Sequence, residues 1–248
     1  MSMQPDQLRS IAEAIAREIL AGGAAPRKVE SSPGDGLFAT IDECAKAARA
    51  AFFALDAVGL DARKRIIENM RARLRPMAEH LARMAVEESN LGRVEDKIDK
   101  IRLVIDKTPG PEDLEGRALS GDHGLALIEP APFGVIGAIT PVTNPSSTII
   151  CNAIGMISAG NSVVFNAHPS AKKVSALTVS LLNKAIVEAG GPSNLLTCTI
   201  EPTIESAGQL MKHPLIRLLV VTGGAGVVAA AMNSGKRAIC AGPGNPPA

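Results

Sequence analysis

The sequence predicts an α/β protein in which a doubly wound parallel sheet has helices on both faces and is preceded by an α-helical segment. Two observations carry this prediction. From residue 133 onward, short and almost uncharged β-rich segments alternate with helical stretches, which is typical of a parallel sheet covered on both faces. Before residue 110, the segments are dense in charge and carry a single apolar stripe each, which is typical of amphipathic helices.

Residues 5–20 are the first expected element, a small amphipathic helix. Four apolar side chains recur at helical spacing and share one face: Leu8, Ile11, Ile15 and Ile19. Residues 21–36 follow, with the Gly, Ala, Ser and Pro content of a linker. The pattern alone leaves two interpretations open. The helix packs back onto the body or an oligomer, or its apolar face docks into a groove on a partner.

Four further helices are expected, over residues from about 40–55, 62–75, 77–89 and 92–108. Thr40 and Glu43 have capping-box spacing, so the first of these helices should begin there. Asp61 is expected to cap the second, and Pro76 to interrupt it. Most charges on these helices should be solvated and joined by i,i+4 pairs.

Strands and helices are expected to alternate in the second half of the chain. The expected strands are Val135–Ile139, Ser162–Phe165, Leu195–Ile200, Ile216–Val221 and Arg237–Cys240. The expected helices lie near Ser146–Ser158, Ser170–Ala189, Thr203–Met211 and Ala225–Asn233. Right-handed crossovers would give a nucleotide-binding type of domain, in which ligands bind at the carboxyl ends of the strands.

One of these strand ends carries a dinucleotide-binding pattern. Gly224, Gly226 and Ala229 follow a strand with GxGxxA spacing, which lets a pyrophosphate approach a helix N-terminus. The pattern also expects an acidic residue about 20 positions later, but the last acid in the chain is Glu205. A tight turn without a ligand is therefore about as well supported.

Two other strand ends hold polar side chains that could act on a ligand. Asn144 lies between two prolines, so its amide should be held in one direction, as an oxyanion donor requires. An Asx turn or a helix N-cap is the favoured interpretation from the pattern alone. His168 precedes a proline and is interpreted as a loop residue rather than a catalyst.

Composition excludes several classes of protein. The 26 Lys+Arg against 25 Asp+Glu give a net charge of +1, which argues against nucleic-acid and membrane-surface partners. No apolar run is long enough to span a bilayer. With five Phe and no Trp or Tyr, aromatic stacking sites are nearly excluded. A short-chain reductase is disfavoured, because this chain has no tyrosine for the Tyr-x-x-x-Lys pair of such enzymes.

The cysteines and histidines have no metal-ligand spacing, so no metal site is expected. Wide cysteine spacing and the absence of a signal peptide predict reduced thiols in the cytoplasm. Cys151 and Cys198 lie inside apolar segments, and we expect them to be packing residues. Cys240 is the only thiol placed where a ligand could approach.

Several long motifs, in order, resemble the aldehyde dehydrogenase superfamily. They are residues 132–175, 188–196, 211–228 and 236–247. Residues 84–100 and 107–114 are similar to its CoA-acylating branch, the propionaldehyde and acetaldehyde dehydrogenases. The resemblance covers about residues 38–247. The N-terminal helix and linker resemble the encapsulation peptides of enzymes carried in bacterial microcompartments, which favours the docking interpretation.

The resemblance implies an aldehyde-dehydrogenase-like fold and a reaction. A short-chain aldehyde is oxidised to its acyl-CoA through a cysteine thioester, with NAD as cofactor, NADP left open, and coenzyme A as co-substrate. Asn144 matches the oxyanion donor. The residues of this chain that match the family's cofactor cleft are Thr140, Pro141, Val142, Asn166, Ala167, His168, Pro169, Thr222, Gly223, Gly224 and Val227. The resemblance also implies a homo-oligomer inside a cytoplasmic microcompartment, docked to shell or core proteins through residues 5–20.

Two departures separate the chain from water-using members of the superfamily. Asn166-Ala167-His168 stands where those members carry a lysine, which removes a cation from the ribose region and leaves NAD versus NADP open. Cys240 stands where they carry a general-base Glu. Losing the base that activates water fits a thioester that is resolved by a thiol.

The family's nucleophilic cysteine follows the GPGNPP motif, and no cysteine of this chain stands there. We therefore expect residues 37–248 to be a cofactor-binding domain without the nucleophile, part of a longer enzyme or of a shortened chain, and inactive alone. Two strands near residues 125–139 would then lack partners from the missing half. The alternative is a non-catalytic truncated homologue that acts as a docking or assembly module.

Overall fold

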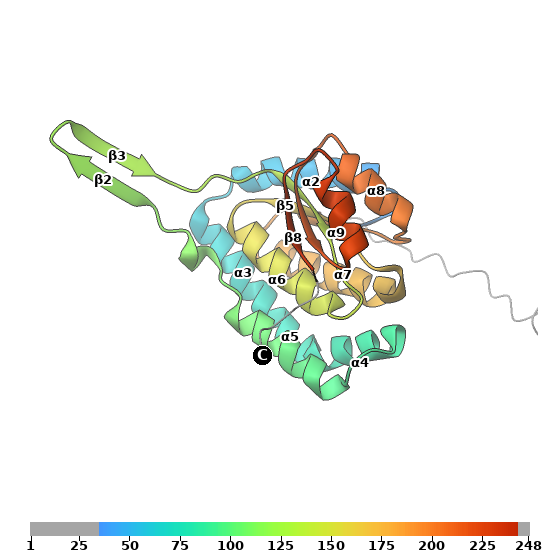
Figure 1. The fold of residues 1–248 in the computed structure, drawn as a ribbon. Helices are drawn as coiled ribbons and strands as arrows, with labels where there is room; N and C mark the ends of the chain where they lie inside the picture. The colour runs from blue at the N-terminus through green and yellow to red at the C-terminus, as the bar shows by residue number, and fades with distance from the viewer. Residues whose placement is uncertain (1–34, 243–248) are drawn as a thin grey trace, which may run out of the picture. The chain divides into compact units, whose positions relative to one another are not determined.

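The computed structural model describes residues 35–242. They form a six-stranded sheet, a separate two-stranded hairpin, and helices that cover the larger sheet (Figure 1). The expected helix over residues 5–20 and nearly all of the expected linker lie outside the described residues.

The larger sheet is parallel and doubly wound, with strand order β1-β6-β5-β4-β7-β8. Its strands are β1 (Leu37–Phe38), β4 (Val135–Ile139), β5 (Ser162–Asn166), β6 (Leu196–Thr199), β7 (Ile216–Thr222) and β8 (Ala238–Ala241). The winding reverses between β4 and β7, because the strands that follow β4 add first on one side and then on the other. Ligands of doubly wound sheets bind at such a reversal.

Successive residues of the central strands face two different hydrophobic cores. Val163 and Phe165 of β5 belong to one core and Val164 to the other, as the alternation of side chains along a strand requires. All residues of β4 and β5 are buried. The continuous apolar runs in the sequence therefore correspond to strands covered on both faces.

Helices supply both covers. One core lies mainly against α6 and α7, with α3, α4 and α5 behind them, and the other lies against α2, α8 and α9. The helices are α2 (Ile41–Asp56), α3 (Leu60–Leu74), α4 (Ala78–Ser89), α5 (Val94–Lys107), α6 (Pro145–Ser158), α7 (Lys172–Glu188), α8 (Ile204–Lys212) and α9 (Ala225–Met232). Within residues 35–242, none is long and apolar enough to cross a membrane.

The expected start and interruption of the early helices are partly confirmed. The capping box is present, because Glu43 N–H donates to Thr40 Oγ1 at 3.2 Å and Thr40 N–H donates to Glu43 Oε2 at 3.0 Å. Pro76 lies in a 3-10 turn between α3 and α4, as predicted. The capping role predicted for Asp61 is wrong: α3 begins two residues earlier than expected, at Leu60, Gly59 is its N-cap, and Asp61 lies inside the first turn.

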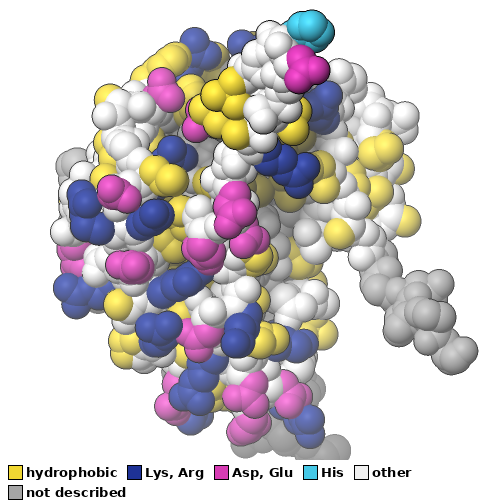
Figure 2. Space-filling model, turned by 90° about the vertical axis from the view of Figure 1, so that its left-hand side faces the viewer, with side chains coloured by type: hydrophobic (Ala, Val, Ile, Leu, Met, Phe, Trp, Pro, Cys, Tyr) yellow, Lys and Arg dark blue, Asp and Glu magenta, His cyan; other side chains and the backbone are white. Residues whose placement is uncertain are grey.

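Charged side chains of both signs are interspersed on the face seen in Figure 2. Asp42 pairs with Lys46 at 2.6 Å and Glu79 with Arg83 at 2.7 Å, both at i,i+4 spacing on exposed helix faces. The prediction of solvated faces joined by such pairs is confirmed for these two helices.

The hairpin consists of β2 (Arg117–Gly121) and β3 (Gly124–Ile128), paired antiparallel, and every residue in both strands is exposed. It extends away from the helices that cover the sheet (Figure 1). The prediction that two strands near residues 125–139 lose partners is wrong for β4, which has a neighbour on each side, and stays a prediction for β3, which is paired along one edge. The strand β3 pairs with β2, and β4 lies between β5 and β7.

Candidate functional site

Three loops meet at the carboxyl ends of β4, β5 and β7 and enclose two adjoining pockets. We call them the Asn144 pocket, of about 450 Å³, and the Thr140 pocket, of about 380 Å³. Both are lined by Pro141, His168, Thr222, Gly223 and Gly224. The Asn144 pocket adds Val142 and Asn144, and the Thr140 pocket adds Thr140, Asn166, Ala167, Pro169 and Val227. All the residues that the sequence assigned to the cleft are therefore brought together.

The N-terminus of α9 forms part of the wall of both pockets. Gly224 is the N-cap of α9, and a Cβ built on it would meet no atom within 4 Å. The first N–H groups of a helix have no intrahelical partner, so they can bind an anion that approaches this open corner. A Cβ on Gly223 would instead lie 2.6 Å from Val227 Cγ1, so any larger residue at position 223 would force the Val227 side chain on the first turn of α9 to move.

Asn144 begins α6, but its side chain does not cap the helix. Its carbonyl accepts the Thr148 N–H at 3.0 Å, whereas its amide makes no capping hydrogen bond. Pro145 occupies the first helical position and has no N–H to satisfy. The predicted N-cap position of Asn144 is confirmed, but its side chain makes no capping hydrogen bond, so the half-buried amide at the pocket wall is available to a ligand.

Thr140 is a second residue at this edge whose polar side chain makes no hydrogen bond within the described part of the fold. It is only 2% exposed, and its Oγ1 has no hydrogen-bond partner among the described residues. Its backbone N–H donates to the Asn166 carbonyl at 3.3 Å and joins the ends of β4 and β5. A buried hydroxyl without a partner costs roughly 1–3 kcal/mol, so a ligand atom that bonds to Thr140 Oγ1 would relieve this cost.

Asn166 and His168 use their side chains within the fold. Asn166 Oδ1 accepts from Ser206 Oγ at 2.6 Å, and Asn166 Nδ2 lies 3.5 Å from the Thr203 carbonyl. These contacts join the end of β5 to the start of α8. His168 Nδ1 accepts the Ser170 N–H at 3.2 Å, as expected for a loop residue. Both residues shape the pocket walls. Because the oxygen and the nitrogen of the Asn166 amide both have partners in the fold, this amide has little capacity to bond to a ligand.

No cysteine lines either pocket. Cys44 and Cys198 are buried, and desolvation raises the pKa of both thiols, that of Cys198 to about 12. Cys240 is half-buried on β8 and does not line the cleft. The packing role predicted for Cys151 is wrong: Cys151 is exposed on α6, since this helix buries only part of its apolar surface. The chain therefore presents no thiol nucleophile at this edge.

Several pocket residues were not found from the sequence. Ile204 and Ala207 of α8, Thr148 of α6 and Gly242 after β8 also line the pockets. The sequence predicts the helix near Thr203–Met211, but no motif marks the side chains of α8 as part of a site. Among the described residues, no three His, Cys, Asp or Glu side chains gather in a way that could hold a metal ion.

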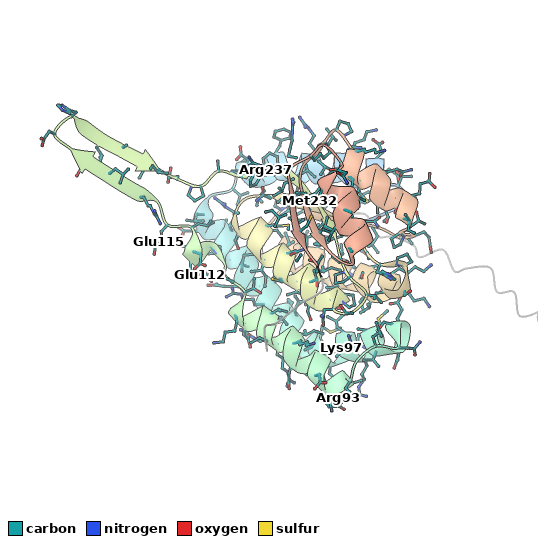
Figure 3. The ribbon with its side chains drawn as sticks, viewed as in Figure 1. Arg93, Lys97, Glu112, Glu115, Met232 and Arg237 are labelled. Carbon is teal, nitrogen blue, oxygen red and sulfur yellow. The ribbon has the colours of Figure 1, made fainter. Side chains whose placement is uncertain are left out.

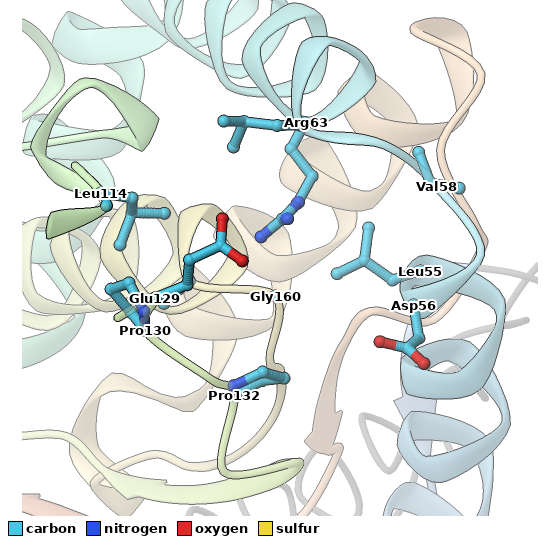
Figure 4. Close-up of a pocket in the computed structure, with 12 residues that line it drawn as sticks. Leu55, Asp56, Val58, Arg63, Leu114, Glu129, Pro130, Pro132 and Gly160 are labelled. Carbon is cyan, nitrogen blue, oxygen red and sulfur yellow. The ribbon is translucent and has the colours of Figure 1, made fainter. Parts of the chain in front are cut away.

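A third pocket, of about 270 Å³, lies at the opposite edge of the sheet. Pro132 and Gly160, which line it, precede β4 and β5. Arg63 and Glu129 extend into it (Figure 4). Arg63 Nη1 donates to the Ser158 carbonyl at 2.9 Å, whereas its buried Nε has no hydrogen-bond partner among the described residues. None of the residues that the sequence assigned to the cleft lies there.

Comparisons with known proteins give a family match over most of the chain. The model of the aldehyde dehydrogenase family matches residues 32–247. A propanal dehydrogenase (CoA-propanoylating) from Salmonella typhimurium is 43% identical over 246 residues, which cover 99% of this chain and 52% of the relative.

Two solved structures are similar over most of the chain. A propionaldehyde dehydrogenase from the Clostridium phytofermentans fucose utilisation bacterial microcompartment is 51% identical with a TM-score of 0.83, and the match covers 85% of this chain and 48% of that one. An engineered glycolyl-CoA reductase with bound NADP⁺ is 46% identical with a TM-score of 0.84, over 87% and 49% of the two chains. The chain thus spans about half the length of the relatives it matches.

Proposed function

Because the chain belongs to the aldehyde dehydrogenase family, we propose that it supplies the nicotinamide dinucleotide cleft of a CoA-acylating aldehyde dehydrogenase. The whole enzyme would oxidise a short-chain aldehyde, propanal or acetaldehyde, to its acyl-CoA. One observation carries the proposal. Three loops far apart in the sequence place all the residues assigned to the cleft around two adjoining pockets at the reversal of a doubly wound sheet.

The residues present fit a dinucleotide in one direction. The open corner at Gly224 and the N-terminus of α9 suit the pyrophosphate. The Thr140 pocket has apolar walls from Ile204, Ala207 and Val227, which suit the adenosine half, and the unpartnered Thr140 hydroxyl offers it a hydrogen bond. The Asn144 pocket is left for the nicotinamide and the aldehyde.

When bound, the nicotinamide would accept a hydride from the aldehyde carbon. Asn144 would donate its amide hydrogen to the aldehyde oxygen as negative charge develops on it. The thiolate that attacks the carbonyl and carries the acyl group to CoA needs a cysteine at the cleft, and none of the chain's four cysteines lines it. We propose that polypeptide outside the described residues provides this thiolate.

Calorimetric titration of NAD, NADP and CoA into the 248-residue chain tests the proposal, with Gly224→Asp as the key variant. Aspartate is a good N-cap, and a Cβ at this position meets nothing within 4 Å, so the variant should unfold at the same or a higher temperature than wild type. Its carboxylate would face the pyrophosphate, and dinucleotide affinity should fall by about tenfold or more.

Gly224→Asn is the matched control, since it caps the helix without a negative charge. It should bind NAD much more tightly than Gly224→Asp. Equal affinity in Gly224→Asp and wild type, or no dinucleotide binding by wild type, would contradict the proposed cleft. The NAD and NADP affinities of wild type decide which cofactor is used.

We also propose that residues 5–20 dock the protein to shell or core proteins of a bacterial microcompartment in the cytoplasm, as part of a homo-oligomer. Two observations support this: the match to the Salmonella relative extends over 99% of the chain, and a similar structure comes from a microcompartment. Deleting residues 1–20 should leave dinucleotide affinity unchanged and abolish co-localisation with a shell. A loss of folding would instead favour a packing role for this segment. Light scattering of wild type and of the variant without residues 1–20 measures the oligomeric state of each.

A further inference from the structure

Lys97 is a buried lysine in a helix whose other lysines are exposed. It lies on α5 and is 7% exposed (Figure 3), whereas Lys100 and Lys107 of the same helix are exposed. Lysine is almost never fully buried unless its ammonium has a partner. The feature therefore needs an explanation that amphipathic packing of α5 does not give.

The partner is a backbone carbonyl in the candidate cleft. Lys97 Nζ donates to the Thr143 carbonyl at 2.6 Å, across 46 residues of sequence. Thr143 precedes Asn144 and lines the Asn144 pocket with it. No carboxylate pairs with Lys97 among the described residues. The buried ammonium therefore contacts the loop that carries Asn144.

The surroundings of Lys97 enclose its side chain on several sides. A residual cavity of only about 10 Å³ separates Lys97 from Ala85 of α4 and from Asn144 and Pro145 at the start of α6. Gly92 covers the stem: its φ is +78°, and a Cβ built on it would lie 3.2 Å from Lys97 Cε. Desolvation lowers the pKa of Lys97 below the usual lysine value.

We propose that Lys97 is a positioning residue, whose ammonium holds the Thr143 carbonyl and thereby fixes the direction of the Asn144 amide in the cleft. This inference rests on the proposed function, because it needs a ligand at the Asn144 pocket. Hydrogen bonds to charged groups are roughly twice as strong as neutral ones, and this bond joins a helix in the outer layer to the end of a central strand.

The test separates the two halves of the ligand. NAD and ADP-ribose share the adenosine and both phosphates, but only NAD carries the nicotinamide that would reach the Asn144 pocket. Lys97→Met removes the ammonium and keeps the length of the side chain. We expect it to weaken NAD binding by about tenfold and to leave ADP-ribose binding unchanged. Lys100→Met, on the exposed face of α5, should change neither affinity.

A double-mutant cycle shows whether Lys97 acts through Asn144. In an Asn144→Ala background, Lys97→Met should have little further effect on NAD affinity. If Lys97→Met does not fold, Lys97→Gln gives the same comparison with a neutral donor in place of the ammonium.

The outcomes are distinguishable. If wild type binds neither NAD nor ADP-ribose, the proposed function fails and this inference fails with it. If wild type binds both ligands, three results overturn the role of Lys97 alone: both affinities unchanged in the variant, both reduced equally, or the same NAD loss with and without Asn144.

Discussion

The two edges of the parallel sheet use asparagine in opposite ways. Asn161, just before β5, is 3% exposed, and its Oδ1 accepts the N–H groups of Phe133 at 2.7 Å and Gly134 at 3.1 Å. Its Nδ2 donates to the Met156 carbonyl at 3.1 Å. Asn144, just after β4, makes no side-chain capping bond. The amino edge uses its amide to hold the fold together, and the carboxyl edge keeps its amide available.

The comparison teaches how two asparagines at opposite edges of the same sheet differ in their hydrogen bonds. Buried polar groups in proteins are normally hydrogen-bonded, and Asn161 follows this rule completely. Thr140 Oγ1 breaks it within the same cleft to which Asn144 contributes. Ser162 Oγ and Arg63 Nε at the amino edge also have no partner among the described residues, so the carboxyl edge is distinguished by the pockets that its assigned residues line.

The largest expected effect is on the structural edge. Asn161→Ala removes the acceptor of two backbone N–H groups, one of them buried, and should lower the free energy of unfolding by about 3 kcal/mol. Urea unfolding followed by circular dichroism measures it. The NAD affinity of the folded variant should match that of wild type. A smaller loss of stability than in Asn144→Ala would break the comparison.

The second effect is on binding. Asn144→Ala removes an amide that holds no part of the fold, so its free energy of unfolding should stay within about 0.5 kcal/mol of wild type. Its affinity for NAD, measured by calorimetry, should fall by about tenfold, because the pocket that Asn144 lines is also the one proposed for the nicotinamide. A stability loss of about 1 kcal/mol or more would show that the side chain caps α6 after all.

The smallest effect sharpens the comparison at a single hydroxyl. Thr140→Val removes the unpartnered Oγ1 at nearly constant shape and should raise the free energy of unfolding by about 1 kcal/mol while weakening dinucleotide binding. Thr178→Val is the matched control, because Thr178 is fully buried and its Oγ1 donates to the Val174 carbonyl at 2.7 Å. The control should be destabilised. Destabilisation of both variants would mean that Thr140 Oγ1 has a partner in solution.

The parallel sheet could be predicted because its sequence signal is local. The strand β4 matches its expected bounds, and β5 and β7 differ by one residue at the carboxyl end, since continuous apolar runs end at Pro- and Gly-rich loops. The very short β1 and the fully exposed β2 were missed, because neither has an apolar run or an alternating pattern. Roles for the cleft residues came from the family resemblance, not from periodicity.

The features that sequence reasoning missed or misjudged depend on packing between elements. From the sequence, Lys97 is predicted to be an exposed charge on an amphipathic helix. It is buried because α4 and the start of α6 pack against it. Cys151 lies in an apolar helix, but the sheet covers only one side of α6 and leaves this thiol exposed. Asn144 is the N-cap of α6, as its position predicts, but the sequence does not show that its side chain makes no capping hydrogen bond.

One measurement tests the central claim most directly: backbone amide chemical shifts of the ¹⁵N-labelled chain during titration with NAD. The largest changes should fall at Thr140, Thr143, Asn144 and residues 223–227, at the carboxyl edge of the sheet. Residues Gly160 and Asn161, at the opposite edge, should hardly change. The largest changes around Arg63 and Gly160, in the third pocket, would contradict the account.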